Sequence, residues 1–540
     1  MRFFCTLILL FTFAMQSIAT QRYIIYFADK GNTDEAKFDI TDVLSTDAIA
    51  NRKKNGIGFD RYDIPVSAGY LHTLEANQVT VISTSRWLNA AMVETNLTAE
   101  QLHQSLPSIS RITEVQSSPA ATSKFRLPSG NAVPTAGPLK TTGRYAYGDA
   151  YSQNMLYNIA HLHDQGFTGL GITIAFLDAG FTGMDTNPAF TNTFNNNRVK
   201  ATKDFVNNNP SVYGTDSHGA NCASLVIGYL PSSFVGMAPD VNLMLAITDD
   251  ITTETHADEY NYIAAVEWAE SIGTEIISVS LTYKIFDAGV GDYVYTDMDG
   301  KTTISSLGAR IAAAKGLILI NSADNSGFIG TPCDVDSILC VGGADLFRNY
   351  DNTSAQGPAA DGRIKPDVAG ATRNINYIDP TGTVRNYIYG GTSSSTPQIA
   401  GLAACLKQKY PYAANYQIIK AIQQSAHQYT APDAKIGYGV PSAGKADTIL
   451  GNMLLSVEEL PAQPQQVAIY PNPAGNTLYL EAKEDIRQAQ VTNMVGSTIL
   501  SSSPNAPVST INLQQLPSGM YIINITLGNN TRQSIKFFKQ

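Results

Sequence analysis

The sequence GGTSSSTPQIAG, residues 390–401, is the stretch around which this chain is organised. Its two glycines permit a tight backbone turn, a hydroxyl-rich segment follows, and the apolar run at residues 399–406 has helical spacing. The pattern predicts a helix over residues 393–409 with Ser393 at its start. Free N–H groups at a helix N-terminus favour negative charge, which suits a nucleophilic serine and a developing oxyanion. A Ser/Thr-rich cap of an ordinary helix is the alternative, so the rest of the chain must decide.

Length and composition favour an acidic protein of several domains. A chain of 540 residues is too long to fold around one ordinary hydrophobic core, so we expect three or so domains. A hydrophobic content of 44% is sufficient for well-packed globular domains. The net charge of -10 argues against nucleic acid as the main partner, because phosphate binding needs basic patches.

The first 19 residues have the pattern of a secretory signal peptide. Arg2 supplies the positive start, residues 3–14 are apolar, and residues 17–19 offer small side chains for cleavage. A membrane anchor is the alternative, but the apolar run is short for a full span and no other stretch is long enough. We therefore expect an exported mature protein without a transmembrane span.

The cysteines are consistent with export, which permits disulfides. Cys333 and Cys340 bracket a short loop, and a local disulfide between them is the favoured interpretation, although the sequence alone does not establish connectivity. Cys222 and Cys405 fall in predicted helices among small apolar residues, where we expect buried free thiols.

Residues 20–140 are predicted to form a small α+β module followed by a linker. Strand-like and helical segments alternate over roughly the first hundred residues of this region. The composition then shifts at residues 117–140 to Ser, Pro, Ala and Gly without a hydrophobic period, which is typical of a linker. Basic residues in and beside it offer cleavage points for a protease: Lys124, Arg126, Lys140 and Arg144.

Residues 141–455 alternate near-continuous apolar strands with helical segments. This alternation predicts an α/β domain with a parallel sheet covered by helices on both faces. Functional groups in such domains lie at the carboxyl ends of the strands. The expected strands are residues 171–177, 241–247, 275–281, 317–322 and 338–342, and the expected helices are residues 217–228, 256–272, 304–315, 393–409 and 415–426.

The C-terminal residues differ in composition from the central region. A linker at residues 456–466, rich in Pro, Glu and Gln, precedes short strands at regular spacing over residues 467–540. This spacing predicts a small β-sandwich. The segment contains neither His nor Cys, so it is a poor candidate for catalysis. Strands are expected at residues 477–481, 488–493, 508–513, 519–527 and 534–538.

Four polar residues fall on predicted turns at the carboxyl edge of the central sheet. Asp178 ends the first strand, His218 begins a helix in a glycine-flanked turn, and Asn325 follows a later strand. With Ser393 they supply a nucleophile, a base, a carboxylate that orients the base and an amide for an oxyanion. Each of these residues alone would be interpreted as a turn or cap residue. Four of them at one edge of the sheet instead favour a catalytic site.

The order Asp, His, Asn, Ser resembles that of the subtilisin-like serine proteases, the subtilases. The resemblance covers roughly residues 145–450 and implies a serine endopeptidase. In it Asp178 orients the imidazole, His218 is the base, Ser393 attacks and Asn325 holds the oxyanion. A catalytically inactive subtilase scaffold that acts as a surface adhesin or binding protein is the second hypothesis, and the complete triad argues against it. The matching motifs are IAFLDAG at 174–180, DSHG at 216–219, GMAP at 236–239, SADNSG at 322–327, GRIKPDV at 362–368, GTS at 391–393 and TP at 396–397.

The sequence departs from the family pattern at the substrate cleft. The family usually has Ala-Gly-Asn at the oxyanion residue, and that glycine lines the pocket for the side chain preceding the scissile bond; here the position is Asp324. The family's Ser-Leu-Gly strand, which borders bound substrate, resembles Ser280 and Leu281 followed by Thr282. We hypothesise that Asp324 narrows the pocket or favours a basic side chain.

Both flanking modules resemble accessory domains. The N-terminal module is placed and sized like a propeptide, which in the family assists folding and inhibits until it is cleaved off. The C-terminal module resembles the sorting domains of type IX secretion cargo in Bacteroidota, through YPNP at 470–473, LPSGMY at 516–521 and KFFK at 536–539. The resemblances imply protein or peptide substrates, secretion machinery as a partner, and a secreted or cell-surface location in a Gram-negative bacterium. Many subtilases bind calcium, so calcium stays open as a cofactor, with no residue assigned to it.

Overall fold

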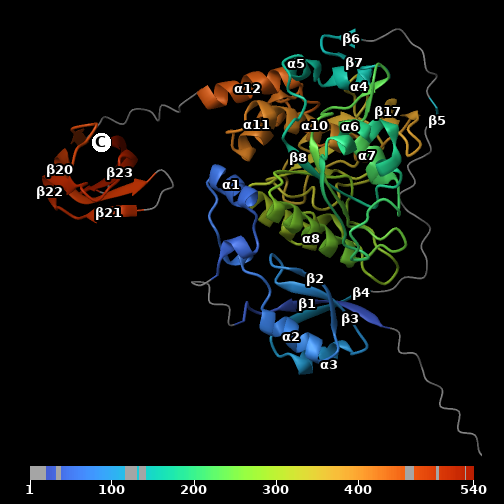
Figure 1. Ribbon diagram of the computed structural model, residues 1–540, viewed down its shortest axis with the longest axis horizontal. Helices are drawn as coiled ribbons and strands as arrows, with labels where there is room; N and C mark the ends of the chain where they lie inside the picture. The colour runs from blue at the N-terminus through green and yellow to red at the C-terminus, as the bar shows by residue number, and fades with distance from the viewer. Residues whose placement is uncertain are drawn as a thin grey trace, which may run out of the picture. The chain divides into compact units, whose positions relative to one another are not determined.

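The computed structural model describes residues 20–31, 38–115, 131–132, 141–455, 467–493, 498–529 and 531–540 (Figure 1). The expected signal peptide at residues 1–19, nearly all of the first linker and the second linker at residues 456–466 lie outside the described residues. The chain divides into two compact units, Met1–Met453 and Leu454–Gln540. Among the described residues, no helix has the length and apolar character needed to cross a membrane.

The N-terminal module is a four-stranded antiparallel sheet with two helices on one face. Its strand order is β2-β3-β1-β4. Thr98 starts helix α3 with a capping box, because its side chain accepts from the Gln101 backbone N–H. Ile25, Val93 and the helix residues Leu74 and Leu102 share one apolar core. The elements are β1 (Gln21–Phe27), α1 (Thr46–Lys54), α2 (Ala68–Ala76), β2 (Thr80–Ser85), β3 (Ala90–Thr95), α3 (Ala99–Ser105) and β4 (Ile109–Val115).

A seven-stranded parallel sheet forms the centre of the first unit, with the strand order β16-β15-β14-β13-β8-β12-β9. The inner strands are almost wholly buried, which explains their near-continuous apolar sequences. The prediction of a parallel α/β fold is therefore confirmed. The strands are β8 (Thr173–Asp178), β9 (Val199–Asp204), β12 (Asn242–Ile247), β13 (Ile276–Val279), β14 (Ile318–Ser322), β15 (Leu339–Ala344) and β16 (Val368–Ala371).

Helices cover both faces of this sheet. Along β8, Ile174 and Phe176 lie in the core beneath α10, whereas Ala175 and Leu177 lie in the core beneath α8. The alternation follows from the pleat, since successive strand residues point to opposite faces. The principal helices are α7 (His218–Ile227), α8 (His256–Ile272), α9 (Ile304–Ala314), α10 (Thr392–Lys409), α11 (Asn415–Ser425) and α12 (Ala443–Leu455).

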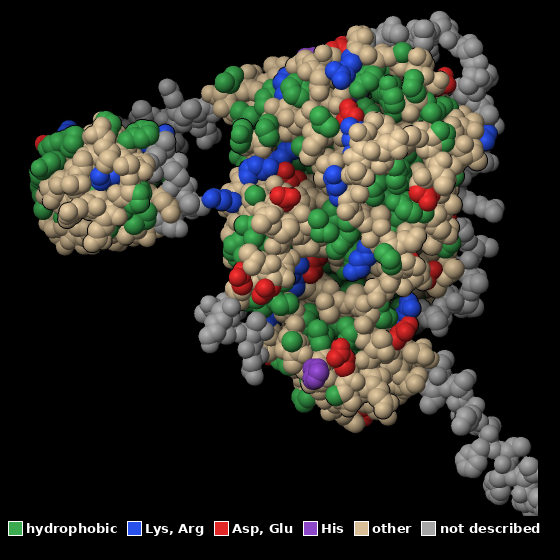
Figure 2. All heavy atoms as spheres, viewed as in Figure 1, with side chains coloured by type: hydrophobic (Ala, Val, Ile, Leu, Met, Phe, Trp, Pro, Cys, Tyr) green, Lys and Arg blue, Asp and Glu red, His purple; other side chains and the backbone are tan. Residues whose placement is uncertain are grey.

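Smaller elements complete the first unit. Strands β17 (Ile375–Ile378) and β18 (Val384–Tyr387) form an antiparallel hairpin, and β5 (Asn131–Ala132) pairs with β18. On the face shown in Figure 2, acidic and basic side chains are interspersed. Besides short 3-10 helices, the remaining described elements of this unit are β6 (Thr141–Thr142), β7 (Tyr145–Ala146), α4 (Tyr151–Leu156), α5 (Ala160–His163), α6 (Thr191–Asn195), β10 (Tyr229–Leu230) and β11 (Phe234–Val235).

The N-terminal module packs on helix α8, which lies between the two sheets (Figure 1). Trp87 and Met92 of the module share an apolar core with Tyr260 and Ala264 of α8. Helix α1 reaches the far end of α8, where the Ser45 backbone N–H donates to the Ser271 carbonyl at 2.8 Å. The module thus contacts α8 along much of its length.

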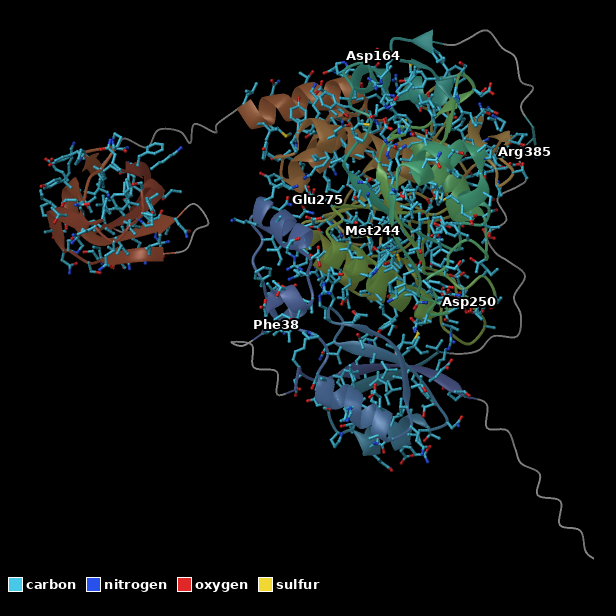
Figure 3. The ribbon with its side chains drawn as sticks, viewed as in Figure 1. Phe38, Asp164, Met244, Asp250, Glu275 and Arg385 are labelled. Carbon is cyan, nitrogen blue, oxygen red and sulfur yellow. A yellow bond between two sulfur atoms is a disulfide. The ribbon has the colours of Figure 1, made fainter. Side chains whose placement is uncertain are left out.

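Buried ion pairs reinforce this contact. Arg52 is 2% exposed and lies 2.7 Å from carboxylate oxygens of both Asp63 and Glu270. Lys54, the last residue of α1, lies 2.8 Å from Glu275, which Figure 3 shows beside that helix. Because a buried charge is costly without a partner, the Arg52 pairs disfavour the separation of α1 from α8.

The second unit is a single six-stranded sheet that curls around its own core, including Leu480, Val491, Ile523 and Phe537. The expectation of separate strands at residues 477–481 and 488–493 is wrong, because both belong to the 17-residue strand β20. The polar stretch between them stays in strand conformation, while irregular register lets β20 change partners from β22 to β23. The strands are β19 (Val467–Tyr470), β20 (Thr477–Asn493), β21 (Thr498–Ser502), β22 (Ala506–Asn512), β23 (Gly519–Leu527) and β24 (Arg532–Lys539).

Candidate active site

A buried carboxylate and a buried imidazole meet at the carboxyl edge of the parallel sheet. Asp178 is the last residue of β8, and His218 is the first residue of α7. Asp178 Oδ1 lies 2.7 Å from His218 Nδ1 and also accepts a hydrogen bond from the Ala179 backbone N–H at 2.8 Å. Gly219 allows this approach, because a Cβ there would lie 2.6 Å from the Gly180 carbonyl and 2.8 Å from Asp178 Cβ.

The environment of His218 favours its protonated form. Burial, the largest single influence, lowers the pKa of His218, but the charge of Asp178 and the interactions with Cys222 together outweigh it and raise that pKa well above the ordinary value. An imidazole held in this way is stabilised once it has accepted a proton. The pair therefore has the chemistry of a general base with its orienting carboxylate.

Ser393 lies in the first turn of α10 and is 5% exposed. Its hydroxyl donates to the Ser280 carbonyl at 3.2 Å, and the Ser280 hydroxyl donates to the Ser393 carbonyl at 3.0 Å. This exchange of hydrogen bonds joins the start of α10 to the residue that follows β13. Ser280 and Ser393, both predicted from the sequence as site residues, are thus in direct contact.

Cys222 is a further side chain in this region that sequence reasoning placed only as a buried thiol. Its Sγ donates to the Ser393 carbonyl at 3.3 Å and lies 3.9 Å from His218 Nδ1. The signal was its spacing, because four residues after His218 means one helical turn along the same face. Cys222 therefore links α7, which carries His218, to α10, which carries Ser393. Cys405 is a buried free thiol elsewhere in α10.

Asn325 lies in the loop after β14 and is exposed. Its Oδ1 accepts hydrogen bonds from the Thr392 backbone N–H at 2.8 Å and from the Thr392 hydroxyl at 3.1 Å. With Oδ1 engaged, the amide nitrogen makes no hydrogen bond to any described residue and is free to donate. Gly391 permits this contact, since its φ is +64° and a Cβ there would lie 2.6 Å from Asn325 Oδ1.

Asp324 is paired with a lysine that sequence reasoning missed. Asp324 Oδ2 lies 3.0 Å from Lys284 Nζ, and Lys284 also donates to the Ser326 and Phe328 carbonyls at 2.9 Å each. The available signal was a lysine three residues beyond Leu281, at the end of an apolar strand. The side chain of Leu281 lies in the core beneath α8, while its carbonyl accepts a hydrogen bond from Asn321 Nδ2 at 2.8 Å.

A disulfide joins Cys333 to Cys340 in the structure, with their Cα atoms 4.9 Å apart. Both half-cystines are buried in a small apolar cluster with Ala323 and Ile329. The bridge therefore packs behind the loop that carries Asp324 and Asn325.

Two groups of described residues have donor atoms close enough for a cation. One is Asp178, His218 and Cys222, whose hydrogen bonds are described above. The other consists of three buried carboxylates, Asp249, Glu254 and Asp258. Burial, reinforced by the neighbouring carboxylates, raises the pKa of both Asp249 and Asp258 well above the ordinary value. Both oxygens of Asp258 already accept backbone N–H groups, from Asp250 and Thr255, so we assign no metal to the cluster.

Comparisons with known proteins find relatives of all three parts of the chain. Residues 169–439 match the family model described as the subtilase family. Residues 22–127 match the peptidase S8 propeptide domain of Bacteroidota, and residues 468–540 match the secretion system C-terminal sorting domain. A sorting domain of this kind indicates a secreted or cell-surface protein.

Individual relatives are bacterial proteases. The thermostable alkaline protease of Halalkalibacterium halodurans is 27% identical over 294 residues, which are 54% of this chain and 71% of that protein. Subtilisin E of Bacillus subtilis is 26% identical over 290 residues, 51% of this chain and 67% of that protein. The crystal structure of MycP1 from Mycobacterium smegmatis aligns with a TM-score of 0.47 at 22% identity, covering 59% of this chain and 87% of that one.

Proposed function

Since this chain belongs to the subtilase family of serine endopeptidases, we propose that it is an exported enzyme that hydrolyses peptide bonds in proteins through Asp178, His218 and Ser393. The observation that carries the proposal is the 2.7 Å contact between Asp178 Oδ1 and His218 Nδ1, with both side chains buried. A carboxylate on Nδ1 selects the tautomer whose Nε2 can accept a proton. Ser393 lies at the start of α10, and α10 packs against α7, which carries His218.

In the proposed reaction, His218 acts first as base and then as acid in each half-reaction. The Ser393 hydroxyl attacks the scissile carbonyl carbon while its proton passes to His218 Nε2, and the resulting oxyanion accepts hydrogen bonds from Asn325 Nδ2 and the Ser393 backbone N–H. His218 then gives the proton to the leaving amine. Water, activated by the same imidazole, hydrolyses the acyl-enzyme and restores Ser393.

The flanking domains fit the same function. The match to a propeptide domain makes the chain a zymogen. We propose that residues 20–140 are the propeptide with its linker, that residues 141–455 are the peptidase domain, and that cleavage in the linker at residues 117–140 releases the active enzyme. The sorting domain at residues 467–540 would engage the secretion machinery.

The test compares the exported protein with its Ser393→Ala and Ser337→Ala variants. Fluorescent casein reports hydrolysis, a serine-directed fluorophosphonate reports the nucleophile, and mass spectrometry identifies the new termini. We expect Ser393→Ala to lower turnover roughly a million-fold, as for catalytic residues of subtilisin, and to abolish labelling. Ser337 is exposed, so its alanine variant should behave as wild type.

Near wild-type hydrolysis by Ser393→Ala would contradict the proposal. A folded protein that has already lost its N-terminal module, yet neither cleaves casein nor reacts with the phosphonate, would instead support an inactive scaffold with a binding role.

A further inference from the structure

Two short segments flank the pocket proposed for the side chain that precedes the scissile bond, the P1 side chain. One is residues 280–282, after β13, and the other is residues 323–325, after β14. Each carries a side chain where the family pattern has glycine, Thr282 in the first and Asp324 in the second. The structure shows where these two additional side chains lie.

The side chains of Thr282 and Asp324 converge on Gly330. A Cβ added at Gly330 would lie 2.9 Å from Thr282 Cβ and 3.1 Å from Asp324 Oδ2. Both separations are shorter than an ordinary van der Waals contact, which is about 3.4–4.0 Å for such atoms. The Gly330 backbone N–H also donates to the Ala323 carbonyl at 3.1 Å, so Gly330 is held against the segment at residues 323–325. Beside Gly330, therefore, the side chains of Thr282 and Asp324 leave no space for even one additional methyl group.

Lys284 holds the Asp324 carboxylate in this position. Its side chain is only 7% exposed, and Nζ donates to three oxygens, those of the Asp324 side chain and of the Ser326 and Phe328 carbonyls. Nζ also lies 4.7 Å from the centre of the Phe328 ring. All of these partners belong to residues 324–328, so the Lys284 ammonium group fixes the conformation of the loop that carries Asn325.

The backbone conformation of Asp324 is energetically unfavourable for a residue other than glycine. Its φ is +94°, in a region that non-glycine residues rarely adopt. Surrounding contacts must hold such a residue in place. Here Oδ2 pairs with Lys284, and Oδ1 accepts a hydrogen bond from the Asn325 backbone N–H at 2.5 Å. Both carboxylate oxygens are therefore engaged, and the negative charge already has its counter-charge.

We propose that Thr282 and Asp324, with Lys284 as a positioning residue, close the P1 pocket so that the enzyme cleaves after glycine, alanine or serine. This inference rests on the proposed function and decides between the two sequence-based hypotheses for Asp324. The carboxylate narrows the pocket, and it does not recognise a basic P1 side chain because Lys284 already occupies it.

The test measures kcat/KM on peptides that differ only at P1, which is Ala, Phe or Arg. We expect wild type to prefer Ala over Phe and over Arg by at least about tenfold, in the range that a pocket of fixed size gives. The double variant Thr282→Gly/Asp324→Gly should raise the Phe-to-Ala ratio about tenfold or more.

A double-mutant cycle tests the ion pair between Lys284 and Asp324 separately from the size of the pocket. Lys284→Met leaves the Asp324 carboxylate without its counter-charge, so the Arg-to-Phe ratio should rise about tenfold, and adding Asp324→Asn should cancel that rise. Lys409→Met is the matched control, because Lys409 pairs with Asp447 at 2.7 Å about 24 Å along α10 from Ser393. It should leave both P1 ratios as in wild type.

Wild-type cleavage after Phe or Arg as fast as after Ala would overturn the inference, and this outcome does not depend on any variant folding. An unchanged Arg-to-Phe ratio in folded Lys284→Met would overturn the role of the ion pair. Failure of the proposed function looks different, since no peptide would then be cleaved and the phosphonate would not label Ser393.

Discussion

His218 Nδ1 lies 2.7 Å from Asp178 Oδ1, and the two side chains are only 3% and 2% exposed. The partners come from the start of α7 and the end of β8, forty residues apart in the chain. A buried carboxylate in this position does two things to the imidazole, since it fixes the tautomer and stabilises the protonated form. Each effect can be measured separately.

Asp178→Asn should lower kcat by about 10⁴, with little change in overall stability. The asparagine amide can donate to Nδ1, which selects the tautomer whose Nε2 carries a proton and cannot act as base. Turnover of a peptide substrate by the mature enzyme checks this. Asp361→Asn, which removes an exposed carboxylate paired with Arg363, is the control and should retain wild-type turnover. A loss of less than tenfold in Asp178→Asn would contradict the orienting role.

The pH dependence of kcat/KM should show an acid limb with its midpoint above about 6.5, the ordinary value for histidine. The base must be neutral to accept a proton, and the pKa of His218 is raised, so activity rises only as pH passes through that higher value. In Asp178→Asn the opposing effect of burial remains, so the midpoint should move to lower pH. A wild-type midpoint below that of the variant would be inconsistent with the Asp178–His218 pair.

Asn325→Ala should lower kcat by about 10² to 10³ and leave KM nearly unchanged. Its amide nitrogen is oriented by the bonds that Oδ1 accepts from Thr392, and an oxyanion forms only in the transition state. Steady-state kinetics on one peptide separate the two parameters. An effect confined to KM would instead assign Asn325 to ground-state binding of the substrate.

Arg52→Ala should destabilise the uncleaved chain by roughly 1.5–3 kcal/mol, because the buried carboxylates of Asp63 and Glu270 each lose one charged partner and keep another, Lys315 and Arg86. The Ser393→Ala background prevents processing, so that urea unfolding reports one species. Arg22→Ala is the matched control, since the Arg22–Glu94 pair is more than one-third exposed and should contribute at most about 1 kcal/mol. Equal effects of the two variants would argue against a buried interface between α1 and α8.

Asp249→Asn should raise the melting temperature at pH 8, and the gain should disappear towards pH 4. Burial raises the pKa of Asp249, so the folded state binds its proton more tightly than the unfolded chain does. Stability from this group is therefore present at low pH and is lost as pH rises through the raised pKa. At pH 8 the unfolded chain ionises this carboxyl group freely, whereas the folded state must either bind a proton or bury the charge, and the neutral asparagine amide avoids both costs. A lower melting temperature at pH 8 would contradict this and would point to a cation held by the cluster.

Local patterns in the sequence predicted much of the secondary structure. Helix α8 has the expected bounds and α10 begins one residue earlier than expected, because capping residues and hydrophobic periodicity act over a few neighbouring residues. The pattern failed at β20, where a polar stretch was interpreted as a gap between strands. Its pairing partners lie elsewhere in the chain, and tertiary pairing overrode the local signal.

The sequence by itself determined the parallel class of the central sheet, five of its seven strands, and the positions of Asp178, His218, Asn325 and Ser393 at strand ends and helix starts, but it missed β9 and β16. Apolar runs and turn residues carry that information locally. Only the tertiary structure decided which side chains share hydrogen bonds and space: Cys222 beneath Ser393, Arg52 between two carboxylates, and Lys284 on Asp324. These contacts depend on how separate elements pack, and no local period in the sequence encodes the distance between residues 40 or 200 positions apart.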